Sequence, residues 1–162
     1  EECPQNLFGG RQWFGLDFLS DGSMDRSKTP QKAKNASNFI NIFLDHWQDK
    51  FAVSDHNTFL IGFSQGSMMA LEVGIKRQVG GLVCYSGSFI NASKTLSYKP
   101  NIILIHGDID EVIPIQNMIS AKNKLIDLGA NVTTFKCVGV GHSIDKIGIS
   151  KGIEFIKKCK IK

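Results

Sequence analysis

Short apolar runs alternate with longer amphipathic segments along most of the chain. Apolar-rich runs bounded by glycine or polar residues are typical of buried strands. They occur at residues 58–63, 79–85, 102–105 and 131–137. Segments in which apolar residues recur every three or four positions predict helices at residues 29–51, 67–73, 114–128 and 143–156. This alternation predicts an α/β fold, with a parallel sheet and helices on both of its faces.

The clearest helical pattern begins near residue 29. Thr29 and Pro30 favour a helix start, with threonine as the cap and proline at the first helical position. Apolar residues then follow at helical spacing: Ala36, Phe39, Ile40, Phe43, Leu44, Trp47 and Phe51. The preceding residues 1–29 are rich in Gly, Ser, Asp and Pro and predict a loop. Its aromatic residues indicate that the loop packs on the rest of the protein.

Composition narrows the class of protein. The 162 residues include 42% apolar and 21% charged residues, which is ordinary for one globular domain spanning residues 1–162. No apolar run approaches the ~20 residues that a membrane-spanning helix needs. Much of the net charge of +4 lies in residues 157–162. We interpret this stretch as a solvated helix end, because no basic face with interleaved aromatic residues accompanies it to bind nucleic acid.

The four cysteines, Cys3, Cys84, Cys137 and Cys159, are scattered without C-x-x-C spacing. This spacing argues against a zinc site or a disulfide framework. Cys84 lies in an apolar run and is predicted to be a small buried residue. Reduced thiols, together with the lack of a secretory signal in the sequence, predict a cytoplasmic location.

The most specific motif is Gly62-Phe63-Ser64-Gln65-Gly66, between a predicted strand and a predicted helix. G-x-S-x-G in this context is the nucleophile-elbow pattern of α/β-hydrolases. We expect both glycines to be required, because side chains two residues before and after the serine would collide in so tight a turn. The sequence therefore predicts that Ser64 is an exposed nucleophile at a strand–helix junction.

Two potential partners of Ser64 follow later in the chain. The strand at residues 102–105 leads into a loop with Asp108 and Asp110, and a glycine-rich loop after the last strand presents His142. The order Ser, Asp, His is that of the α/β-hydrolases. Each candidate comes directly after a predicted strand, at the sheet edge where α/β sites collect. A histidine would activate the serine hydroxyl, and a carboxylate would orient the imidazole.

Several residues have competing interpretations. We favour Asp110 over Asp108 as the orienting acid, and expect Asp108 to bind nearby backbone N–H groups instead. His106 is predicted to be structural because it ends a buried strand. His46 and His56 are predicted to lie on the surface. Met68 either lines an acyl pocket or belongs to the core, and Trp13 either forms a substrate wall or anchors the first loop.

Together these motifs resemble the phospholipase/carboxylesterase family of α/β-hydrolases, which includes the acyl-protein thioesterases. The matching residues are Arg11-Gln12-Trp13-Phe14, Gly62-Phe63-Ser64-Gln65-Gly66, Ser86-Gly87, His106-Gly107-Asp108-Ile109-Asp110 with Val112 and Pro114, and Gly141-His142-Ser143. The resemblance implies Ser64 as nucleophile, Asp110 as orienting acid and His142 as general base. It also implies the Gln65 N–H as an oxyanion donor. Our own candidates for substrate contacts are Trp13, Met68 and Val112.

By the same resemblance, the substrates are small acyl esters, lysophospholipids or acyl-proteins, and no cofactor or metal is needed. One feature departs from the family: no His-Gly-x-Gly loop, the source of a second oxyanion donor, occurs before Ser64. We therefore expect a chain without the N-terminal strands of the fold, with an open sheet edge, an uncovered apolar face on helix 31–51, and a tendency to form a homodimer. The alternative function is a weakly active or inactive hydrolase that acts as a binding or self-associating module.

Overall fold

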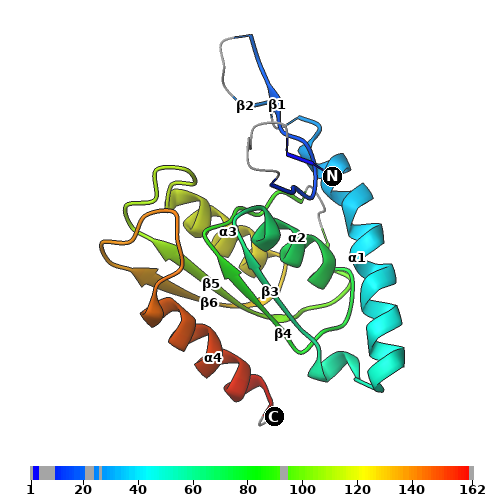
Figure 1. The fold of residues 1–162 in the computed structure, drawn as a ribbon. Coiled ribbons are helices and arrows are strands. Elements are labelled where there is room, and N and C mark those ends of the chain that lie inside the picture. Colours follow the sequence, from blue (N-terminus) through cyan, green and yellow to red (C-terminus); the bar gives the residue numbers. More distant parts are fainter. Residues whose placement is uncertain (1, 4–9, 21–23, 26, 92–94, 161–162) are drawn as a thin grey trace.

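The computed structural model describes residues 2–3, 10–20, 24–25, 27–91 and 95–160. A four-stranded sheet forms its centre (Figure 1). The strands are β3 (Phe59–Phe63), β4 (Gly81–Tyr85), β5 (Asn101–Gly107) and β6 (Asn131–Cys137). They lie side by side in chain order, and all three pairings are parallel. The predicted parallel sheet is confirmed.

Helices cover both faces of the sheet, as predicted (Figure 1). They are α1 (Thr29–Phe51), α2 (Gln65–Gly74), α3 (Gln116–Asp127) and α4 (Lys146–Lys160). On one face, α2 and α3 pack against β4 and β5 through an apolar cluster that includes Leu71, Leu104 and Leu125. On the other face, α4 packs through Phe155 and Ile156. Because the four strands are parallel, their carboxyl ends lie at one edge of the sheet.

The N-terminal segment is more ordered than a plain loop. Two-residue strands β1 (Asp17–Phe18) and β2 (Met24–Asp25) pair antiparallel, and an isolated bridge joins Glu2 to Arg11. A short 3-10 turn (Asp55–Asn57) follows α1. Strands this short lack the alternating apolar pattern that would reveal them in the sequence.

All four predicted helix starts are corrected: α2 begins at Gln65 and not at Ser67, and α3 begins at Gln116 and not at Pro114. Thr29 is the first residue of α1 and not its cap; Lys28 takes the cap position, and no side chain there bonds the helix backbone. The last helix begins at Lys146 and not at Ser143, because Asp145 caps it. The Asp145 carboxylate accepts a hydrogen bond from the Gly148 N–H at 2.8 Å. This bond lowers the pKa of Asp145 below its ordinary value.

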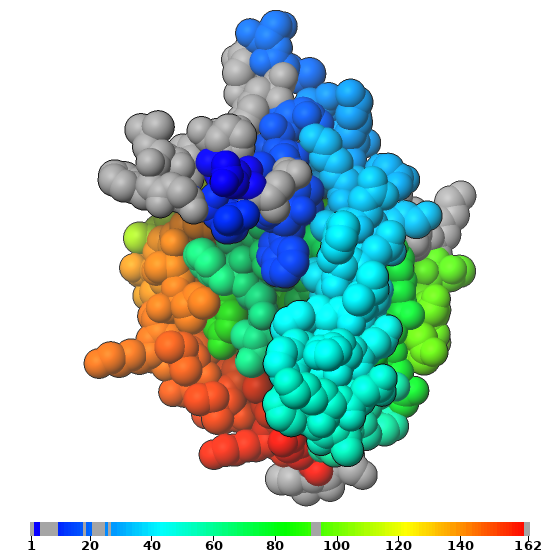
Figure 2. Space-filling view, turned by 45° about the vertical axis from the view of Figure 1, so that its right-hand side comes forward, coloured from blue at the N-terminus to red at the C-terminus, as the bar shows by residue number. Residues whose placement is uncertain are grey.

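The apolar stripe of α1 is largely uncovered among the described residues. The buried residues of this helix are Thr29, Ala33, Ala36 and Ser37, which are small. The β3–α1 apolar surface, defined here as Phe39, Phe43, Phe51 and Ile61, has residue exposures of 75%, 61%, 64% and 61%. Figure 2 brings α1, in cyan, to the front. In the described part of the chain, β3 pairs only with β4, so the expected open edge and uncovered helix face are both present.

None of the described helices is both long enough and apolar enough to cross a bilayer.

Candidate active site

Ser64 lies at a sharp turn between β3 and α2. Its backbone dihedrals are φ 54° and ψ −119°, a conformation that residues other than glycine rarely adopt. Two hydrogen bonds hold it: the Ser64 N–H donates to the Tyr85 carbonyl at 2.9 Å, and the Ser67 N–H donates to the Ser64 carbonyl at 3.0 Å. The turn therefore presents the serine side chain at the carboxyl edge of the sheet.

The two glycines of the motif have different roles. A Cβ on Gly62 would lie 2.2 Å from the Gly66 carbonyl oxygen and 2.5 Å from the Ser67 nitrogen. Glycine is therefore required at position 62, as expected. At Gly66 a Cβ would meet only the Trp13 indole nitrogen, at 3.9 Å. The expectation that Gly66 relieves a collision within the turn is therefore wrong, since the space beside it faces the N-terminal segment.

His142 reaches Ser64 because the loop after β6 lies directly on the end of β5. A Cβ on Gly107 would lie 2.1 Å from the Val140 carbonyl oxygen, so only glycine allows this approach. The Phe63 ring also packs against the imidazole, with centroids 4.8 Å apart. Sequence reasoning assigned no role at the site to Gly107 or Phe63. A glycine directly after His106 at the end of the strand was the sequence signal that could have indicated this close approach at Gly107.

The structure joins Ser64, His142 and Asp110 by two consecutive hydrogen bonds, and we call these three residues the relay. His142 Nε2 lies 2.9 Å from Ser64 Oγ, and His142 Nδ1 lies 2.9 Å from Asp110 Oδ2. A carboxylate only accepts, so the proton on the imidazole is at Nδ1, and Nε2 is left to accept from the serine hydroxyl. The His142 side chain is 19% exposed, while that of Asp110 is fully buried.

Asp110 is held in its ionised form by several donors. Its Oδ1 accepts hydrogen bonds from the N–H groups of Val112 at 3.0 Å and Ile113 at 2.8 Å. Burial acts to raise the pKa of this carboxyl, but the bonds from Ile113 and His142 outweigh it and lower the pKa below its ordinary value. A charged carboxylate can therefore orient the imidazole and stabilise its protonated form.

Asp108 and His106 support the loops around the relay. Asp108 Oδ1 accepts a hydrogen bond from the Gly139 N–H at 2.7 Å, which is the backbone role expected of it. His106 is buried, and its Nε2 donates to the Ile113 carbonyl at 2.7 Å. The same nitrogen lies 3.4 Å from Asp110 Oδ2. His106 thus has the structural position predicted for it, and it also flanks the acid of the relay.

Gln65 contributes to the site through both its backbone and its side chain. As the first residue of α2, it has an N–H with no intrahelical partner, at the positive end of the helix dipole. Its side chain accepts a hydrogen bond from the Trp13 N–H at 2.7 Å and donates one to the Phe14 carbonyl at 2.8 Å. Sequence reasoning missed these side-chain bonds, because they join positions more than 50 residues apart.

The three predicted substrate contacts lie in different surroundings. Trp13 is 49% exposed beside Gly66, and Val112 is 66% exposed on the loop that carries Asp110. Met68 is half-buried and packs against the cluster of Phe14, Ala33, Ala36 and Met69. Met68 therefore has the contacts of a core residue, whereas Trp13 and Val112 are accessible. His46 and His56 are exposed, as predicted.

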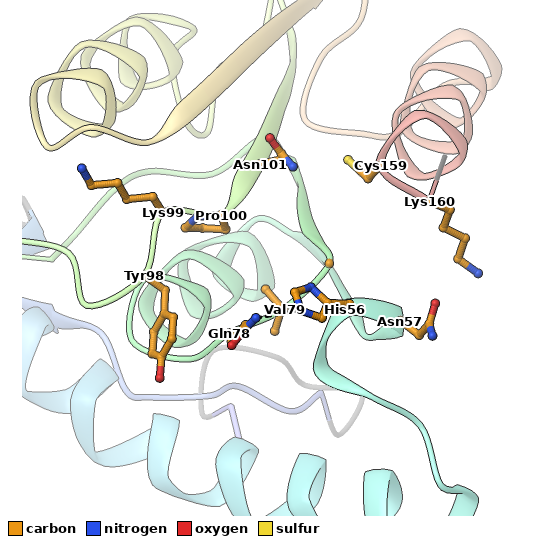
Figure 3. Close-up of a pocket in the computed structure, with 11 residues that line it drawn as sticks. His56, Asn57, Gln78, Val79, Tyr98, Lys99, Pro100, Asn101, Cys159 and Lys160 are labelled. Atoms are coloured by element: carbon orange, nitrogen blue, oxygen red, sulfur yellow. Dashed lines mark hydrogen bonds between the residues drawn. The ribbon is translucent and has the colours of Figure 1, made fainter. Parts of the chain in front are cut away.

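A separate cavity of about 640 Å³ lies at the other end of the sheet (Figure 3). It is lined by the residues that precede β4, by the start of β5 and by the end of α4. Its polar groups pair among themselves or with neighbours: His56 lies 2.9 Å from the Gln78 amide, and Asn101 accepts a hydrogen bond from Asn131. Lys99 and Lys160 extend away from the cavity in Figure 3. None of the relay residues reaches it. Among the described residues, no cluster of acidic, histidine or cysteine side chains could hold a metal ion.

A parallel sheet with a strained serine after β3, an acid after β5 and a histidine after β6 defines an α/β-hydrolase. The phospholipase/carboxylesterase family model matches residues 1–160, and the chain belongs to this family.

Among curated proteins, the chain is 30% identical over 160 residues to esterase YpfH of Escherichia coli, covering 95% of this chain and 65% of that protein. It is 24% identical over 153 residues to acyl-protein thioesterase 1 homolog 1 of Dictyostelium discoideum, covering 90% and 66%. Among solved structures, esterase PE8 aligns with a TM-score of 0.86 and 31% identity, over 98% of this chain and 74% of that one. The chain thus spans slightly less than two thirds of the length of these two curated relatives.

Proposed function

We propose that this protein is a serine hydrolase that cleaves carboxyl esters or thioesters through an acyl-enzyme. The observation that carries the proposal is the relay from Ser64 through His142 to the buried Asp110, with both distances at 2.9 Å. Membership of a family described as phospholipase/carboxylesterase supports the same chemistry.

In the proposed reaction, Ser64 Oγ attacks the acyl carbon while His142 Nε2 takes the hydroxyl proton. The resulting imidazolium is stabilised by Asp110 and returns the proton to the leaving alcohol or thiol. A water molecule then attacks the acyl-enzyme, with His142 again as the base, and releases the acid and free Ser64. The Gln65 N–H donates to the oxyanion that forms at each step. These side chains supply every proton transfer, so the proposal needs no cofactor.

The proposed substrates are small acyl esters, lysophospholipids or acyl-proteins. The names of the relatives, an esterase and an acyl-protein thioesterase homologue, support this range. The exposed Trp13 and Val112 are the proposed substrate contacts. Met68 is proposed only as support behind them, because it packs into the Phe14 cluster. The substrate partners are thus acyl compounds in the cytoplasm and not nucleic acid.

The oxyanion site limits the expected rate. The Trp13 N–H is bonded to the Gln65 side chain and is therefore not available as a second donor. Loss of one oxyanion donor typically lowers kcat by about 10²–10³-fold. Among the described residues, the Gln65 N–H is the one donor assigned to the oxyanion, and we propose that it supports slow esterase turnover.

The β3–α1 apolar surface supports self-association as the second part of the proposal. It joins a strand edge that no other described strand pairs with to exposed aromatic side chains, two features that favour pairing with another copy. We propose a homodimer formed through this surface.

The direct test is hydrolysis of short-chain p-nitrophenyl esters together with labelling by a fluorophosphonate. We expect slow turnover and a covalent label at Ser64, both lost in Ser64→Ala. Ser67→Ala, the next serine along the chain, serves as the control and keeps the label. A folded chain that takes no label at Ser64 would remove the basis of the esterase proposal.

A further inference from the structure

The Gln65 side chain joins the turn that carries Ser64 to a distant segment of the chain. Its Oε1 accepts from the Trp13 N–H at 2.7 Å, and its Nε2 donates to the Phe14 carbonyl at 2.8 Å. The amide thus pairs with two consecutive backbone groups, using one acceptor and one donor. Glutamate would lack the donor, and asparagine is one methylene shorter. The contact therefore requires glutamine.

The two residues held by Gln65 have different exposures. Phe14 is 3% exposed and packs with Ala33, Ala36 and Met69. Trp13 remains 49% exposed, and its indole nitrogen lies 3.9 Å from the Cβ position of Gly66. The indole therefore stands over the first turn of α2, beside the Ser64 turn. It lines two hollows of about 560 and 600 Å³, and the second of these is also lined by Gly62, Phe63 and Gly66 of the Ser64 turn.

Two other described anchors of this segment lie away from the Ser64 turn. Lys32 Nζ donates to the Gly15 carbonyl at 3.0 Å and to Asp17 at 2.8 Å, and so ties the segment to α1. Phe14 ties it to the cluster between α1 and α2. Gln65 is the described side chain that hydrogen-bonds the Trp13 backbone to the Ser64 turn.

We propose that the Gln65 side chain is a positioning residue that locks Trp13 beside Ser64 as a wall of the substrate cleft. The inference rests on the proposed esterase function for its kinetic consequence. It assigns two separable roles to one residue: the backbone N–H serves the oxyanion, and the side chain serves substrate binding. Substitution of the side chain leaves the backbone N–H in place, so the two roles predict different kinetic changes.

The kinetic test compares Gln65→Ala and Gln65→Glu with the unchanged chain. We expect KM for p-nitrophenyl esters to rise about tenfold in both variants, the equivalent of one to two lost hydrogen bonds. We expect kcat to change less than about threefold, because uniform binding is what is lost. Lys32→Met is the matched control, since it loosens the same segment away from the Ser64 turn, and its KM should stay within about threefold. An equal rise of KM in Lys32→Met, or a fall of kcat at constant KM in the Gln65 variants, would overturn the proposal.

A second measurement is independent of activity. The chain has two tryptophans, so Trp47→Phe leaves Trp13 as the sole indole emitter. In that background, Gln65→Ala should shift the emission to longer wavelength and increase quenching by acrylamide. Unchanged emission and quenching would overturn the positioning role even in an active esterase. A shift in a chain without esterase activity would support the positioning role while removing the proposed function.

Discussion

The two halves of the Ser64–His142–Asp110 relay are built in different ways. On the β5–β6 side the Asp110 side chain is fully buried and bonded by backbone N–H groups and His142. On the β3–α1 side, Phe39 and Ile61 remain 75% and 61% exposed. Yet the hydrogen bond between Ser64, at the end of β3, and His142 is as short as the bond between His142 and the buried Asp110. Both distances are 2.9 Å.

The reason lies in where Ser64 is anchored. Its N–H bonds the Tyr85 carbonyl of β4, the interior neighbour, and its turn is closed by the first residues of α2. Neither contact involves the outer edge of β3. The position of Ser64 therefore depends on its contacts with β4 and α2 and not on the outer edge of β3. In our proposals, the outer side of β3 instead contributes to association and to a wall of the substrate cleft.

The largest effect on activity is expected on the β5–β6 side, which carries the buried Asp110. Asp110→Asn should reduce kcat/KM by about 10³–10⁴-fold, because an amide favours the wrong imidazole tautomer. Asp108→Asn, which loses a bond to a loop N–H, should cost less than about tenfold. Steady-state kinetics on the two variants checks the order. A larger loss in Asp108→Asn would reverse the assignment of the acid.

Stability should also separate the two sides. Leu125 on α3 is fully buried, and Leu125→Ala should lower the free energy of unfolding by about 2–5 kcal/mol. Phe43→Ala on α1 removes a side chain that is 61% exposed and should cost less than about 1 kcal/mol. Urea titration of both variants measures the difference. Equal losses would mean that Phe43 is covered in solution, and would support association through this surface.

Self-association should depend on the β3–α1 apolar surface. Ile61→Lys places a charge on the outer edge of β3 and should weaken dimerisation by about 10²-fold or more, since like charges across an interface cost several kcal/mol. Ile119→Lys, on an exposed position of α3, is the control and should leave association unchanged. Sedimentation velocity measures both. A chain that is monomeric at every concentration tested would contradict the homodimer proposal.

The smallest effect is the pH dependence of stability contributed by Asp110. Its pKa in the folded protein lies below the ordinary value of 3.8, so its ionised form stabilises the fold above about pH 3.8. This stabilisation is lost as the pH falls through the lowered pKa. The free energy of unfolding, measured by chemical denaturation between neutral and acidic pH, should therefore fall less steeply with acid in Asp110→Asn than in the unchanged chain. An identical slope in the variant would show that the carboxylate does not contribute.

Much of the architecture could be predicted from local patterns. Apolar runs and helical spacing located every strand of the main sheet and all four helices, and the strand at Asn131–Cys137 has the predicted bounds. Boundaries were less accurate: α4 begins at Lys146, three residues after the predicted start, because Asp145 caps it. Ser64, Asp110 and His142 were identified because each follows a strand, and parallel strands bring their carboxyl ends together.

The sequence by itself determined which residues carry the chemistry and in what order. A serine, an acid and a histidine each follow a strand, on a chain with the motifs of one family. Only the tertiary structure decided which small residues face α2, leaving the aromatic stripe of α1 exposed. It also decided that Gln65 holds Trp13 and Phe14, and that Gly107 admits the His142 loop. Periodicity records which residues share a face of one element. The bonds from Gln65 to Trp13 and Phe14 span more than 50 positions and depend on how the elements pack, and no local pattern encodes that.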